Sequence, residues 1–157
     1  MCRRAIHVVM PTILLISLIF GSSAIALTSK ELTVPLNAQG DTIVLSSKQV
    51  RDGNALFNTA CGMCHASGVT KTDANVNLSA KSLSAAVPNR YNIEGLIDYL
   101  KNPTTYDGQI EISELHPSKK STDIFPSMKN LTNNELTAIA GYILLQTKVK
   151  GAAWADH

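Results

Sequence analysis

Charged and aromatic side chains are both sparse in this sequence. Only 17% of the 157 residues are charged and 5% are aromatic, whereas 45% are hydrophobic. Fourteen basic and twelve acidic residues give a net charge of +2, and twelve of each remain once Arg3 and Arg4 are set aside. A near-neutral chain gains little from counterion release at a phosphate backbone, which disfavours nucleic-acid binding. Length and composition indicate one globular domain.

Long apolar runs are missing after the N-terminus. Two arginines near the start precede an apolar stretch at 13–20, and a small-residue pattern ends at Ala26. This order is typical of a secretory signal peptide, with an uncleaved anchor as the alternative. We expect residues 1–26 to be removed and residues 27–157 to form a single domain. We expect no membrane span in that domain, because no later segment approaches the roughly 20 apolar residues that a span requires.

Cysteine is also scarce, but two of the three cysteines form a motif. Cys2 belongs to the signal, and Cys61-Gly-Met-Cys64 is followed at once by His65. Cys-x-x-Cys-His is the attachment site of a c-type haem. Two thiols at this spacing lie on one face of a helical turn and add to the two vinyl groups, and the histidine binds the iron. We therefore expect one haem c per chain, covalently bound through Cys61 and Cys64, with His65 as an axial ligand.

A Cys-x-x-Cys pair has two other common uses, as a redox-active pair and as part of a zinc site. A redox-active pair lies at the start of a helix after a strand, whereas this pair follows a predicted helix. A zinc site needs two more ligands, and only His116 and His157 remain in the expected mature chain. Export also suits covalent haem attachment, because the haem is joined to reduced thiols after the chain has crossed a membrane.

Hydrophobic periodicity predicts helices after a short hairpin. The fold class that this implies is all-α, a class I cytochrome c-like core with a short N-terminal β-hairpin. We expect only single helical turns between residues 104 and 130. The predicted elements are a hairpin at 31–45 and helices at 47–60, 79–86 (short), 93–101 and 133–146, the last two capped by Asn92 and by a Thr132–Glu135 capping box.

The helix at 47–60 is expected to cross the last helix closely. Gly53 and Gly141 are small enough to allow the approach, and Phe57 and Tyr142 would fill the corner between the two helices.

The second axial ligand has two main candidates, His116 and Met128; Met63 is a weak third because it lies inside the attachment loop. His116 is followed by a proline that stiffens its loop. Met128 lies just before the last helix, where small soluble c-type cytochromes place an axial methionine. Imidazole binds ferric and ferrous iron well, whereas a thioether favours ferrous iron and raises the potential. The chemistry favours His116 and leaves Met128 open.

From about Leu32 to Gln146 the sequence resembles the cytochrome c-550 family, the extrinsic haem subunits of photosystem II in cyanobacteria and some algal plastids. Beside the haem motif, the resemblance rests on four segments: Leu-Thr-Val-Pro-Leu at 32–36, Lys-Asn-Pro-Thr-Thr-Tyr-Asp-Gly at 101–108, Glu-Leu-His-Pro-Ser at 114–118 and Asp-Ile-Phe-Pro-Ser-Met at 123–128.

The resemblance implies a low-potential haem with His65 and His116 as axial ligands, and makes Met128 a neighbour of the haem. It implies no enzymatic activity, since a haem enzyme needs an open coordination position that His116 closes. It also implies a location in the thylakoid lumen. There the partners are the photosystem II core and other extrinsic lumenal subunits, and the role is to stabilise the oxygen-evolving complex. A soluble c-550-like lumenal electron carrier is the alternative.

The tail departs from the resemblance. After Val149 the chain reads Lys-Gly-Ala-Ala-Trp-Ala-Asp-His, whereas the family commonly ends in a Gly-rich, Lys-Tyr-Tyr-type tail that is buried against photosystem II subunits. The difference bears on docking and not on haem binding. Lys101, Lys119 and Lys120 are the expected docking charges, because their pattern indicates no structural role.

Overall fold

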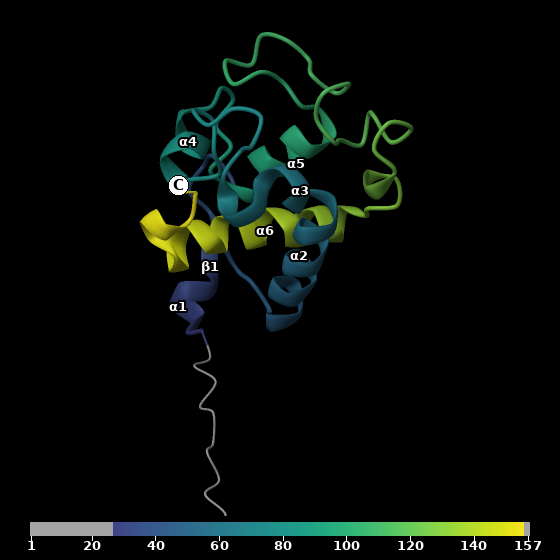
Figure 1. Cartoon of the computed structure of the whole chain (residues 1–157). Coiled ribbons are helices and arrows are strands. Elements are labelled where there is room, and N and C mark those ends of the chain that lie inside the picture. The colour runs from purple at the N-terminus through teal and green to yellow at the C-terminus, as the bar shows by residue number, and fades with distance from the viewer. Residues whose placement is uncertain (1–26, 156–157) are drawn as a thin grey trace, which may run out of the picture.

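A computed structural model describes residues 27–155 of the chain (Figure 1). The expected signal peptide, residues 1–26, lies outside the described residues, as do Asp156 and His157. The elements are α1 (Ser29–Leu32), β1 (Thr33–Pro35), β2 (Thr42–Val44), α2 (Ser47–Ala60), α3 (Gly62–His65), η1 (Ala66–Gly68), α4 (Ala80–Ala85), α5 (Ile93–Lys101), η2 (Pro126–Met128), α6 (Asn133–Val149) and η3 (Gly151–Ala153).

The predicted N-terminal hairpin is present. β1 and β2 pair antiparallel with Val34 opposite Ile43, and the Asn37 side chain closes the turn by accepting from the backbone N–H groups of Gln39 and Asp41. Val34 is only 1% exposed because it belongs to the hydrophobic core. The Lys148 ammonium near the end of α6 donates to two carbonyl groups at the start of the hairpin, so the hairpin is an integral part of the domain.

The helices predicted at 93–101 and 133–146 begin at their predicted caps, and α2 begins after a cap at Ser46. Ser46 and Thr132 each form a capping box, with Gln49 and Glu135 respectively, and the Asn92 side chain accepts from the N–H of Gly95. α6 continues to Val149, three residues past the predicted end. Its last turns carry Gln146 and Thr147, whose polar side chains end the apolar pattern although both are buried.

The crossing of α2 and α6 depends on Gly53. A Cβ on Gly53 would lie 2.1 Å from the Ala138 carbonyl oxygen and 2.8 Å from Cβ of Tyr142, so only glycine permits this approach. Phe57 and Tyr142 fill the corner as predicted, with ring centres 5.3 Å apart. The role predicted for Gly141 is wrong: its α-carbon faces Leu45, whose Cδ2 would lie 2.7 Å from an added Cβ.

α6 runs through the middle of the molecule, between α5 and α2 (Figure 1). α5 buries Ile93, Leu96 and Leu100, the spacing expected for one face of an amphipathic helix. The connection from Asn102 to Phe125 consists of turns and one isolated bridge between Thr104 and Glu111. It loops over the side of the molecule on which α3 and α5 lie, drawn in green in Figure 1. None of the helices described combines the length and apolar composition that a membrane crossing needs.

Candidate haem-binding site

The Cys-x-x-Cys-His motif forms a single helical turn after α2. Cys61 is the C-cap of α2 and the N-cap of α3, and its carbonyl accepts from the N–H groups of Cys64 and His65. Both cysteines are free thiols. Burial, the main cause, together with the neighbouring Cys64 raises the pKa of the Cys61 thiol to about 12. A raised pKa at Cys61 disfavours the thiolate that a redox-active pair would use at that position.

His65 is oriented by the loop that follows it. Its Nδ1 lies 3.2 Å from the Val69 carbonyl oxygen and 3.2 Å from Oγ1 of Thr70. Because a carbonyl oxygen only accepts, Nδ1 carries the proton and Nε2 keeps the lone pair that a metal would use. Burial lowers the pKa of the imidazole, which favours its neutral, ligating form.

His116 comes from the long connection and is held in a similar way. Its Nδ1 lies 3.0 Å from the Pro117 carbonyl oxygen, so Nε2 is again the nitrogen that keeps the lone pair. Its own carbonyl accepts from Oγ of Ser121, which is also 2.9 Å from the buried Oγ of Ser118. Burial above all, and then the repulsion from His65, lower the pKa of His116 to about 4.

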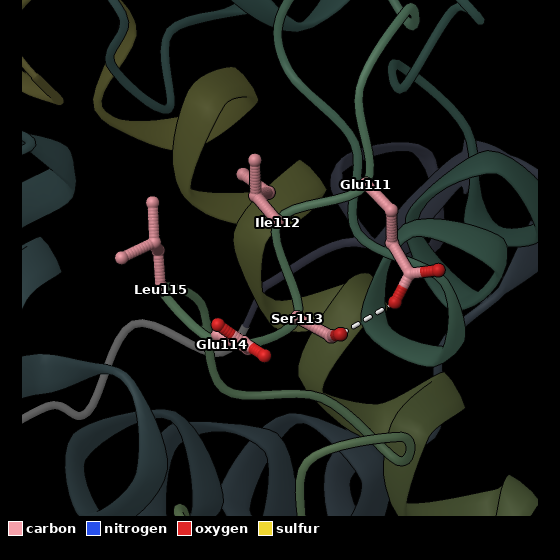
Figure 2. A pocket seen from close by; sticks show the side chains of 5 residues that line it. All are labelled: Glu111, Ile112, Ser113, Glu114 and Leu115. Carbon is pink, nitrogen blue, oxygen red and sulfur yellow. Dashed lines mark hydrogen bonds between the residues drawn. The ribbon is translucent and has the colours of Figure 1, made fainter.

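A tight loop leads into His116. The Ile112 carbonyl accepts from the N–H of His116 at 2.9 Å, and the Ile112 N–H donates to the Pro103 carbonyl. Figure 2 shows the five consecutive residues from Glu111 to Leu115 that line a hollow in this loop, with the Ser113 hydroxyl donating to the Glu111 carboxylate. All of the lining comes from the one loop that leads into His116.

The two histidines, 51 residues apart in sequence, meet in space. Their ring centres are 6.1 Å apart and their planes are tilted by 50°. Two neutral imidazoles at this separation, each with its lone pair on Nε2, can hold a single metal ion between them. Within the described residues no three or more His, Cys, Asp or Glu side chains gather as a metal cluster.

The two methionine candidates lie in different surroundings. Met63 is 83% exposed, so its thioether points to solvent from the attachment loop. Met128 is fully buried and belongs to the hydrophobic core cluster. Its sulfur therefore packs among apolar side chains, as thioethers readily do.

Two of the expected docking lysines have partners within the chain. The Lys119 ammonium donates to three backbone carbonyls, those of Met128, Lys129 and Leu131, at 2.8–2.9 Å. Lys120 forms an ion pair with Glu111 at 2.9 Å. The expectation that Lys119 has no structural role is wrong, because its ammonium closes the turn before α6. No sequence pattern signals such a contact, since it joins a side chain to carbonyl groups nine to twelve residues away.

The helical core, the haem motif on α3 and the second histidine facing it define a c-type cytochrome. Residues 25–157 match the family model described as "Cytochrome c-550 domain", and the chain belongs to this family. The match runs through the tail that follows Val149. The family resemblance expected from the sequence is therefore confirmed, and so is the fold class.

The chain is similar to several proteins named Photosystem II extrinsic protein V. The one from Nostoc punctiforme is 60% identical over 156 residues, covering 98% of this chain and 96% of the relative. The one from Trichormus variabilis is 59% identical over the same coverage. Among solved structures, cytochrome c549 is 58% identical with a TM-score of 0.80, covering 82% of this chain and 99% of that one. The PsbV2 cytochrome of Thermosynechococcus elongatus is 29% identical with a TM-score of 0.66, and the match covers 78% of this chain and 87% of that one.

Proposed function

We propose that this protein is a low-potential, bis-histidine c-type cytochrome with no enzymatic activity. Cys61 and Cys64 hold one haem c by thioether bonds, and Nε2 of His65 and Nε2 of His116 are its axial ligands. The bound haem supplies one-electron exchange between ferric and ferrous iron. Two imidazoles favour the ferric state more than a methionine ligand would, which makes the centre a low-potential one.

The separation of the two imidazoles is the observation that carries the proposed ligation. With a metal–nitrogen bond of about 2 Å and a ring centre roughly 1 Å behind the ligating atom, two imidazoles on opposite sides of one iron have centres about 6 Å apart. The centres of His65 and His116 are 6.1 Å apart. Both Nδ1 atoms have acceptor partners, so both Nε2 atoms are available.

We further propose that the protein is an extrinsic subunit of photosystem II on the lumenal side of the thylakoid membrane, where it stabilises the oxygen-evolving complex. The support is the name shared by its relatives and their similarity over nearly the whole chain. Residues 1–26 would act as the export signal, leaving residues 27–157 as the mature domain. The photosystem II core and the other extrinsic lumenal subunits are the partners.

The alternative, a soluble lumenal electron carrier, has less support. The tail after Val149, which differs from the common ending of the family, is the feature that favours a carrier. However, the family match includes the tail, and Trp154 is buried in the same core as α2 and α6.

Absorption spectroscopy tests the ligation. The purified holoprotein should show a low-spin haem without the absorbance band of methionine ligation, and His116→Met should introduce that band and raise the midpoint potential. Met128→Ala is the matched control and should leave the low-spin spectrum unchanged. If Met128→Ala lost the low-spin spectrum and His116→Met left it unchanged, the second ligand would be Met128 and not His116.

Rebinding tests the assignment to photosystem II. Photosystem II that has been washed with high salt should bind the holoprotein at low ionic strength and recover oxygen evolution. Haem staining of a gel of the washed and rebound complexes measures the binding directly. A protein that neither rebinds nor restores oxygen evolution would be a carrier and not a subunit.

A further inference from the structure

Arg90 is a buried cation with no acidic partner. The side chain is 6% exposed, and the two ion pairs found within residues 27–155 do not include it. Its Nη2 donates to the carbonyl oxygens of Thr104 and Thr105, at 3.1 and 2.8 Å. Its Nε is buried and has no hydrogen-bond partner. A buried charge is costly unless it is paired, so its retention at this place calls for a physical reason.

The ring of Tyr99 connects the Arg90 guanidinium to His116, which is the proposed second (distal) axial ligand. The Arg90 guanidinium carbon lies 3.9 Å from the centre of the Tyr99 ring, a cation–π contact. The Tyr99 ring centre lies 4.8 Å from that of His116, with the two planes tilted by 59°. The cation is therefore within about 9 Å of the His116 ring, a range over which charges in a low-dielectric interior still interact strongly.

The same arginine fixes the backbone that carries His116. The carbonyls that it binds belong to the connection between α5 and η2, on which His116 lies. A second tyrosine ties this connection to α4, because the Tyr106 hydroxyl donates to the Ser82 carbonyl at 2.7 Å. Arg90 thus joins three parts of the structure, namely the segment before α5, the Tyr99 ring on α5 and the loop of the distal ligand.

We propose that Arg90 is a positioning residue for the distal axial ligand, acting through Tyr99, and that its charge raises the haem midpoint potential. The proposal rests on the proposed bis-histidine ligation. The Tyr99 ring contacts the His116 imidazole and limits its rotation, and the Arg90 guanidinium lies against the Tyr99 ring. Rotation of one imidazole relative to the other changes the electronic structure of the low-spin ferric centre.

The sign of the electrostatic effect follows from the charges of the two redox states. Oxidation of the iron adds one positive charge to the centre, and a fixed cation nearby disfavours that addition. Arg90 keeps its charge at every physiological pH, because an arginine does not deprotonate in a protein. It therefore favours the ferrous state and partly offsets the low potential that two histidine ligands impose.

The matched experiment uses the two arginines of residues 27–157. Arg90→Gln removes the buried cation, Arg90→Lys keeps the charge, and Arg51→Gln removes an exposed cation from α2. The midpoint potential of each purified holoprotein is measured by redox titration. We expect a more negative potential for Arg90→Gln, a smaller shift for Arg90→Lys and the wild-type value for Arg51→Gln. A value for Arg90→Gln that equals that of Arg51→Gln would overturn the electrostatic part.

Electron paramagnetic resonance of the ferric state tests the positioning part. Tyr99→Leu removes the ring and leaves Arg90, so His116 loses the aromatic contact that limits its rotation and the low-spin g values should shift. Tyr99→Phe keeps the ring and should preserve them. Unchanged g values in Tyr99→Leu would overturn the positioning part. This test does not depend on whether Arg90→Gln folds. A wild-type protein without a bis-histidine low-spin spectrum would instead reject the proposed function.

Discussion

The indole ring of Trp154 lies directly on the α-carbon of Gly68. A Cβ on Gly68 would be 2.6 Å from Cε2 of the indole, and Gly68 has a φ of +86° that glycine adopts without strain. The indole Nε1 donates to the Leu78 carbonyl at 2.9 Å, and the N–H of Ala155 donates to the carbonyl of Ser67. The C-terminal tail therefore clamps the loop that follows the haem motif.

This clamp bears on His65, the proposed proximal ligand. The residue after Gly68 is Val69, whose carbonyl accepts from Nδ1 of His65. Trp154 also packs against Phe57 and Tyr142, with ring centres 5.9 and 6.3 Å apart. The aromatic corner predicted for α2 and α6 thus contains a third ring, which comes from the tail and connects the core to the loop of His65.

Removal of the indole should be strongly destabilising. Trp154→Ala leaves a cavity in a site that is 2% exposed, and we expect it to lower the free energy of unfolding by about 3–5 kcal/mol. Trp154→Phe keeps a ring but loses the hydrogen bond to Leu78, which costs about 1 kcal/mol by itself. Guanidinium unfolding of the holoproteins measures both. A loss below 1 kcal/mol in Trp154→Ala would show that the tail does not clamp the loop.

The helix crossing at Gly53 should not tolerate a methyl group. Gly53→Ala places Cβ against a backbone carbonyl that cannot move independently, so α2 and α6 must separate, at a cost of at least about 2 kcal/mol. Gly62→Ala is the control, because its Cβ would lie 3.6 Å from Oδ1 of Asn58, an ordinary contact distance. Thermal unfolding of the two variants gives the comparison, and equal stability would contradict the close approach of the helices.

Lys119 and Lys120 are adjacent but should contribute differently to the free energy of unfolding. Lys119→Ala leaves three carbonyl groups without their charged donor, and we expect a loss of about 2 kcal/mol. Lys120→Ala breaks an exposed pair with Glu111, for which a loss of less than about 0.5 kcal/mol is expected. Urea unfolding separates the two. Lys120→Glu alone is therefore the variant for testing charge in docking, because a replacement of Lys119 would also destabilise the fold.

Two capping boxes should respond differently to acid. Hydrogen bonds from the backbone and then the side chain of Thr132 lower the pKa of Glu135. Since the folded pKa lies below the unfolded one, this carboxylate stabilises the fold above its unfolded pKa. The contribution is lost as the pH falls through the folded pKa. In the box of α2, Gln49 occupies the equivalent position and does not titrate.

The measurement compares Glu135→Ala with Gln49→Ala between neutral and acidic pH. The destabilisation by Glu135→Ala should shrink as the pH falls below the usual carboxylate range, whereas that by Gln49→Ala should stay constant. Parallel pH profiles for the two variants would mean that the charge of Glu135 contributes nothing to the cap.

Local sequence signals predicted the elements well and the contacts between elements less well. The caps at Asn92 and Thr132 were predictable because a cap needs only residues within three positions of each other. The close approach at Gly53 was predicted, but the partner of Gly141 was not, since a glycine indicates that something lies close and not which element it is.

The amino-acid sequence by itself determined the haem motif, the helical pattern around it and two candidates for the second ligand. Covalent attachment depends on five consecutive residues, so no long-range contact was needed to recognise it. The tertiary structure brought His116 to within 6.1 Å of His65, because their meeting depends on how a long connection without regular structure folds over α5. It also decided the places of Arg90, Lys119 and Trp154. Each of these side chains binds backbone groups that are distant in sequence, and no periodicity encodes such contacts.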